Sequence, residues 1–141
     1  MKKLTGRNDV RMQSGCIPYR KLDDGSVEVL LVQSTSSGRW TLPSGGLEPK
    51  LTAEANAKKE TYEEAGVKGK LTYDMGTLLF IKTSTGIKQI LRLYALKVKE
   101  VLEEYPESGA RQRQWFTIKE AQTLSKIGKK QIKRLRRELG A

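Results

Sequence analysis

The feature that most limits how this chain folds is the stretch LPSGGLEPKLTAEANAKKETYEEAGV, residues 42–67. It opens with glycine and proline, which mark a loop, and continues with Ala, Glu and Lys, which are strong helix formers. Thr52 is a typical N-cap and Gly66 a typical stop signal, so we predict a helix over residues 53–65. The sequence thus joins a glycine-rich loop directly to a capped helix.

Three glutamates, Glu60, Glu63 and Glu64, crowd the end of this predicted helix. Residues at i and i+4 stack on adjacent turns, so their carboxylates repel, and the negative end of the helix dipole adds to the cost. Two residue choices that destabilise a helix occur together here, and such a combination indicates a functional site. The plain alternative is a solvated acidic face neutralised by Lys58 and Lys59. The functional alternative is that the glutamates bind a hard cation, Mg²⁺ or Mn²⁺, through their carboxylate oxygens.

The loop before the helix favours the cation. Ser44, Gly45 and Gly46 let the backbone come close, so that it can offer carbonyl oxygens to a metal or amides to a phosphate. The chain contains no histidine, which excludes the usual general base, Ser-His and Cys-His nucleophiles, and the common zinc fingers. Any chemistry must use carboxylates, lysines, hydroxyls or an oxygen-bound metal.

The remaining sequence predicts strands and two further helices. Strands are predicted over about 14–21 and 27–34, over 67–84 and 87–102, and over 111–118, with 34–49 as a loop. A helix should begin at 118, and a basic C-terminal helix should cover about 126–139. This order predicts an α/β (α+β) fold with a mixed sheet, in one domain of residues 1–141.

The net charge of +11 is unevenly distributed. Residues 111–141 hold ten Lys/Arg against two acids, a balance that attracts polyanions. Three interpretations of this tail stay open: a solvated face on a helix that docks through Ile132, Leu135 and Leu139, a nucleic-acid contact, or substrate steering. Nucleic acid is the less favoured partner, because no aromatic residues interleave with the charges to stack bases.

The sequence also predicts where the protein works. No run approaches the ~18 apolar residues of a membrane helix, and the N-terminal MKKLTGRNDVRMQ lacks the apolar core of a secretory signal. Cys16 is the single cysteine, which excludes an internal disulfide and suits a reducing compartment. We therefore expect a cytoplasmic protein without a membrane segment.

The spacing of the loop and helix residues resembles the Nudix box, the 23-residue signature of hydrolases that cleave a diphosphate linked to a second group. The matching positions lie in residues 45–67 and are Gly45, Glu60, Glu63, Glu64, Gly66 and Val67. The resemblance implies an α/β/α sandwich and a bound Mg²⁺, with Mn²⁺ as the alternative. It implies that Glu60, Glu64 and the backbone carbonyl of Ser44 or Gly45 hold the metal. Glu63 would orient or deprotonate the attacking water, and in some members it also contacts metal.

The box departs from the family pattern at three positions. Leu51 stands where the family usually has glutamate, Lys59 where it has arginine, and Thr61 where it has an aliphatic residue. In the family that glutamate and arginine commonly form a salt bridge between loop and helix. With both partners gone, we expect a rewired scaffold.

Residues 11–121 resemble one branch of the family, the diphosphoinositol polyphosphate phosphohydrolases and their bacterial relatives, which also cleave dinucleoside polyphosphates. The resemblance implies a small polyphosphorylated substrate held by Arg11, Gln13, Arg39, Lys88 and Arg111. Ser36 and Ser37 occupy the place of a basic residue of this branch, which favours dinucleoside polyphosphates.

Two other functions remain open from the sequence. The same chemistry could act on an RNA 5′ end, or the altered box could belong to a non-catalytic module that binds nucleotide or RNA. Trp40 and Trp115 could stack a base, but their strand-like surroundings favour packing in the core.

Overall fold

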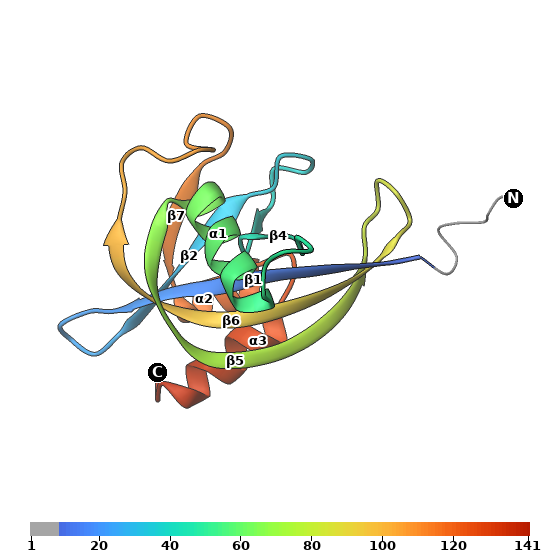
Figure 1. Cartoon of the computed structure of the whole chain (residues 1–141). Coiled ribbons are helices and arrows are strands. Elements are labelled where there is room, and N and C mark those ends of the chain that lie inside the picture. Colours follow the sequence, from blue (N-terminus) through green and yellow to red (C-terminus); the bar gives the residue numbers. More distant parts are fainter. Residues whose placement is uncertain (1–8) are drawn as a thin grey trace, which may run out of the picture.

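A computed structural model describes residues 9–141 of the chain (Figure 1). The strands are β1 (Val10–Lys21), β2 (Val27–Gln33), β3 (Trp40–Thr41), β4 (Ser44–Gly46), β5 (Val67–Ile81), β6 (Lys88–Val101) and β7 (Arg113–Thr117). The helices are α1 (Ala53–Ala65), α2 (Ile118–Leu124) and α3 (Lys129–Glu138). The predictions about a secretory signal, and about the first residues of the 1–141 domain, concern residues 1–8, which lie outside the described part.

The sheet is mixed, as predicted. Its strands follow the order β3-β2-β1-β6-β5, with β4 pairing β1 and β7 pairing β2. β1 and β6 run parallel at its centre, with Val10 opposite Lys88 and Tyr19 opposite Lys97, whereas the other pairs are antiparallel. Because β1 contacts β2, β4 and β6, it fixes the loop strand β4 relative to the rest of the sheet.

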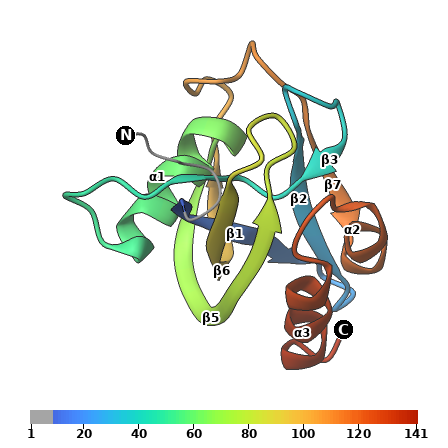
Figure 2. The same ribbon diagram turned by 90° about the vertical axis from the view of Figure 1, so that its right-hand side faces the viewer.

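Helices cover the sheet on two sides. α1 lies on one side of the strands, and α2 and α3 lie on the other (Figure 2). A core cluster with Leu30, Val32 and Leu96 packs beneath Ala57 and Ala65 of α1. A larger cluster, centred on the strand residues Ile17, Val29, Leu31, Leu91, Leu93 and Ala95, packs against α2 and α3. The predicted α/β/α sandwich is confirmed.

Helix α1 begins and ends at the predicted residues, because its capping signals are local. The Thr52 side chain accepts a hydrogen bond from the Ala55 amide at 3.0 Å, and Gly66 takes the left-handed conformation with φ 67°. The C-terminal helix starts at Lys129 instead of 126, after Gly128 with φ 77°. Ile132 and Leu135 of this helix are fully buried, so the docking that was expected of the basic helix is confirmed.

Two strand boundaries were wrong. β1 begins at Val10 instead of residue 14, and the predicted loop 34–49 contains β3 and β4. Neither error has a local cause. Val10 to Gln13 pair with β6, and Ser44 to Gly46 pair with β1. Partners that are distant in the sequence therefore impose the strand conformation, and in β4 they do so despite the low strand propensity of glycine.

Both tryptophans pack against core clusters, as expected. The Trp40 ring meets Phe116 edge-on, with ring centroids 5.1 Å apart. Trp115 packs on the α1 side, and the Arg20 guanidinium lies 3.9 Å from the centre of its ring. In residues 9–141, no helix is long and apolar enough to span a bilayer.

Candidate active site

Glu60 lies against the backbone of the glycine strand β4. A Cβ added at Gly45 would stand 2.2 Å from Glu60 Oε1 and 2.3 Å from its Cδ, so only glycine leaves room for this carboxylate. Burial, and then the charge of Glu63, raise the pKa of Glu60 above its usual value. The close approach explains why the loop requires glycine at this position.

Glu64 is the most enclosed of the three carboxylates, with 8% of its surface exposed. Its Oε1 accepts a hydrogen bond from the Ser44 amide at 3.3 Å and lies 3.7 Å from Arg111 Nη1. Burial raises the pKa of Glu64 to about 8, although the nearby Arg111 opposes the shift. The charge of this carboxylate is therefore only partly compensated by the protein.

Glu63 points to a different partner. Lys59 Nζ lies 2.7 Å from Glu63 Oε2 and 2.8 Å from Glu48 Oε2, and hydrogen bonds to both carboxylates raise the pKa of Lys59. Glu48 belongs to the loop, so an ion pair still joins loop to helix, although Leu51 cannot form it. Lys59 and Glu48 thus connect the loop to α1 in this chain.

Asn56 supplies a second connection between loop and helix. This fully buried side chain donates to Ser14 Oγ at 2.9 Å and to the Gly45 carbonyl at 3.4 Å, and its Oδ1 accepts from the Glu48 amide at 3.2 Å. Satisfied buried polar groups fix geometry because an unpaired partner is costly. Nothing in the sequence pattern of the helix identified Asn56, since its partners come from β1 and the loop.

The described residues fit a hard divalent cation at β4. Glu60 and Glu64 offer carboxylate oxygens on the same side as the Ser44–Gly45 backbone, and burial leaves both charges under-compensated. Oxygen donors of this kind suit Mg²⁺ and Mn²⁺. Within residues 9–141, however, no three side chains of His, Cys, Asp or Glu are already gathered as a metal site. Glu63 is instead paired with Lys59.

A cleft opens beside Glu64. One cavity of about 320 Å³ is lined by Glu64, Arg111, Ser44 and Gly45, and a neighbouring cavity of about 610 Å³ shares with it Gln13, Gly46 and Lys82. Hydroxyl side chains line the first cavity densely: Ser34, Thr35, Ser36, Thr41, Thr83 and Ser84. The cleft thus offers cations and hydroxyl donors next to a buried carboxylate.

The predicted substrate residues divide into two groups. Arg111 and Gln13 line the first cavity, and Arg11 and Gln13 line the second. Arg39 and Lys88 are exposed and line neither of them. Arg111 also pairs with Glu107 at 3.0 Å, and its buried Nε has no hydrogen-bond partner in residues 9–141.

Two cations of the cleft were missed from the sequence. Lys82 precedes the turn between β5 and β6, and Lys126 lies just before the basic helix α3; both line the first cavity. The basic tail was a signal for Lys126, and nothing in the sequence indicated Lys82. Lys126 lies at the cleft and α3 docks on the sheet, while substrate steering by the tail stays a prediction.

Comparison with known proteins identifies the family. The sequence profile of the NUDIX domain matches residues 14–138. The chain therefore belongs to the Nudix hydrolase family. Its fold resembles that of a C. elegans Ap4A hydrolase, with a TM-score of 0.73, 21% identity and coverage of 93% of this chain and 99% of that one. It also resembles the NUDIX domain of Shewanella oneidensis NrtR complexed with ADP ribose, with a TM-score of 0.75, 15% identity and coverage of 94% and 90%.

Curated relatives are more similar in sequence. Nudix hydrolase 12, mitochondrial, of Arabidopsis thaliana is 40% identical over 133 residues, covering 81% of this chain and 66% of that protein. Diphosphoinositol polyphosphate phosphohydrolase 2 of Mus musculus is 37% identical over 118 residues, covering 82% and 63%. The chain thus spans slightly less than two thirds of the length of these relatives. The predicted resemblance to this branch of the family is confirmed.

Proposed function

We propose that the chain is a metal-dependent pyrophosphohydrolase that cleaves a P–O–P bond in a small polyphosphorylated substrate, either a dinucleoside polyphosphate or a diphosphoinositol polyphosphate. The observation that carries the proposal is the position of Glu64. This under-compensated carboxylate lies at the wall of a cleft whose cations are Arg111, Lys82 and Lys126. A bound metal cation would compensate the charge of Glu64, and the polyphosphate attached to it would compensate the charges of the cleft cations. The names of the relatives support the same chemistry.

Each group has a role in this reaction. Glu60 and Glu64 would hold Mg²⁺ or Mn²⁺, which when bound neutralises phosphate charge and polarises phosphorus. Arg111 and Lys82 bind the remaining phosphate oxygens. Glu63 accepts the proton of the attacking water while the new O–P bond forms and the bridging P–O bond breaks. Two phosphate-bearing products leave, and no covalent intermediate is required.

A turnover screen tests the proposal. The protein is incubated with Mg²⁺, Mn²⁺ or EDTA and with dinucleoside polyphosphates, diphosphoinositol polyphosphates, nucleoside diphosphate sugars or 5′-triphosphate RNA, and products are identified by chromatography. We expect metal-dependent cleavage of one of the first two classes, lost in Glu63→Gln. Cleavage of RNA alone would assign the site to RNA 5′ ends. Metal-dependent binding without cleavage would make the chain a recognition module.

The pKa of Glu64 gives a pH prediction. Because this pKa is raised from 4.5 to about 8, the proton on Glu64 stabilises the metal-free fold below pH 4.5, and that stabilisation is lost as the pH rises through about 8. A cation must displace the proton, so its affinity should rise up to about tenfold per pH unit from about pH 6 to about pH 8, then level off.

Calorimetric titration with Mg²⁺ or Mn²⁺ across this range measures the affinity, and buffers of different ionisation enthalpy report the released proton. Glu64→Gln should bind the cation weakly and without this pH dependence. A flat affinity between about pH 6 and about pH 8 in the unmodified protein would contradict the role assigned to Glu64. The predicted cytoplasmic location is separate from these tests and stays a prediction.

A further inference from the structure

A second concentration of positive charge lies at the other end of β1. Three lysines, Lys21, Lys70 and Lys97, line a surface hollow of about 380 Å³. The other lining residues are Tyr19, Leu71, Thr72, Tyr73 and Leu139. None of these residues lines either cavity of the cleft. Roughly 26 Å of strand separates Lys21 from Gln13 in the cleft.

Lys21 and Lys97 are exposed and lie on the same face of the sheet as the larger core cluster, just beyond its end. Side chains alternate between the two faces of a strand. On the face covered by α2 and α3, the core ends with Tyr19 on β1 and Ala95 on β6. Two residues further along each strand stand Lys21 and Lys97. The helix layer ends at the same place, where Leu139, just after α3, forms one wall of the hollow.

The arrangement is unfavourable without a ligand. Lys70 on β5 is directly opposite Lys97 on β6, and like charges in opposite positions destabilise a sheet. In residues 9–141, none of the three lysines is paired with a carboxylate. Protection of a sheet edge from aggregation would explain Lys70, because β5 is an edge strand. It does not explain Lys21 and Lys97, which belong to the inner strands β1 and β6.

We propose that this hollow binds a compact polyphosphate anion, at a site separate from the catalytic cleft. Lysine ammonium groups are point charges that suit phosphate oxygens, and three of them match a small group carrying several charges better than a single carboxylate. The hydroxyls of Tyr19 and Thr72 bond to each other at 3.0 Å, and Thr72 also donates to the Ala95 carbonyl at 3.4 Å, so the three ammonium groups supply the donors of the hollow. Leu139 bounds the hollow, which favours a small anion over an extended nucleic acid. The site uses none of the groups that the proposed hydrolase requires.

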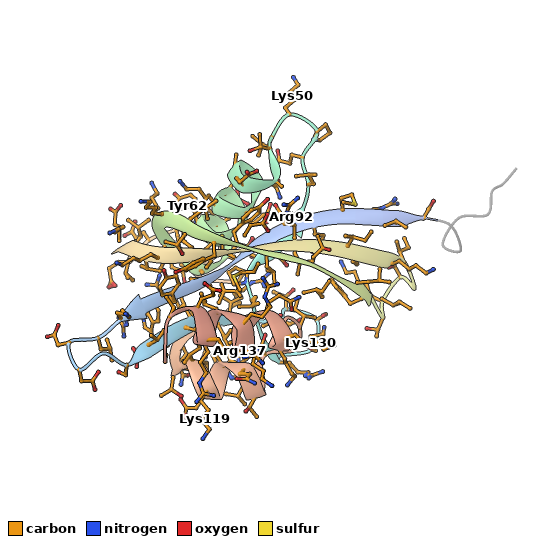
Figure 3. The ribbon with its side chains drawn as sticks, turned by 90° about the horizontal axis from the view of Figure 1, so that it is seen from below. Lys50, Tyr62, Arg92, Lys119, Lys130 and Arg137 are labelled. Atoms are coloured by element: carbon orange, nitrogen blue, oxygen red, sulfur yellow. The ribbon has the colours of Figure 1, made fainter. Side chains whose placement is uncertain are left out.

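The test is calorimetric titration of the full chain with inorganic tripolyphosphate in EDTA, which removes metal-dependent binding at the cleft. We expect one binding event, weakened at least about tenfold in Lys70→Gln/Lys97→Gln. Lys119→Gln/Lys130→Gln removes the same charge from α2 and α3, and Figure 3 shows both side chains on the side of the sheet opposite α1. Lys82→Gln/Lys126→Gln removes it from the cleft. Lys119→Gln/Lys130→Gln should bind as the unmodified protein does, and Lys82→Gln/Lys126→Gln should keep the binding event that Lys70→Gln/Lys97→Gln weakens.

The melting temperature provides a second measurement. Without tripolyphosphate, Lys97→Gln should melt at or above the temperature of the unmodified protein, because the repulsion from Lys70 is relieved. With tripolyphosphate, the unmodified protein should gain stability and Lys97→Gln should not. If all three double variants lost affinity for tripolyphosphate equally, binding would depend on net charge alone, and the proposal would be overturned. Three other results would also overturn it: loss of tripolyphosphate binding only in Lys82→Gln/Lys126→Gln, no binding in EDTA, or binding of long RNA but not of tripolyphosphate. Turnover is read separately, so failure here leaves the proposed hydrolase intact.

Discussion

Replacement of Glu63 by glutamine is expected to lower kcat by about 10²–10⁴-fold, the range associated with a positioned general base. The amide keeps the size of the side chain but cannot accept the proton of the attacking water. Glu60 and Glu64 stay in place against β4, so affinity for the cation should change little. Steady-state kinetics with the substrate found in the screen, together with calorimetric metal titration, separate the two effects.

Glu103→Gln is the matched control for Glu63→Gln. Glu103 is exposed and forms no salt bridge in the described residues, so its replacement removes the same charge without touching the site. Unchanged turnover in Glu63→Gln would show that another group accepts the proton. The ion pair with Lys59 would then be the whole role of Glu63, as part of the connection that runs through Lys59 to Glu48.

The parts of the fold that the sequence predicts correctly are those with local causes. Thr52 and Gly66 set both ends of α1 through contacts within one helical turn. Strand β4 and the first residues of β1 depend instead on pairing with distant segments, whereas the two-residue β3 pairs with the nearby end of β2. Three-residue β4 has the composition of a loop, and only its position beside β1 makes it a strand. Strand propensity depends on residue type, so it cannot predict that β4 pairs with β1.

The same division applies to the site. The spacing of Glu60 and Glu64 along a helix places both near the glycine loop, and the structure brings them there. The spacing does not reveal that Lys59 pairs with Glu63, or that Asn56 connects the loop to β1. These contacts depend on how side chains of α1, the loop and β1 point toward one another, which the order of residues does not determine.

Substitution of Gly45 by alanine should weaken binding of the cation by about 10–100-fold, the range seen when residues supporting metal ligands are changed. The new Cβ would lie 2.2 Å from Glu60 Oε1, 2.3 Å from Cδ and 2.8 Å from Cγ. Since no real Cβ contact is that short, the Glu60 side chain must leave β4. A displaced glutamate can turn to solvent, so we expect the melting temperature to fall little while metal affinity and turnover fall together.

Gly46→Ala is the natural control, because Gly46 is the next residue in the same strand and a Cβ there meets nothing within 4 Å. Alanine at position 46 should leave metal affinity unchanged and, by restricting the unfolded chain, stabilise the fold by up to about 1 kcal/mol. Calorimetric titration with Mn²⁺ and thermal unfolding of both variants give the comparison. If Gly45→Ala bound Mn²⁺ as tightly as Gly46→Ala, Glu60 could not be a ligand in the position it occupies against β4. If both variants lost affinity equally, the effect would lie in the conformation of the loop and not in the space that Gly45 leaves for Glu60.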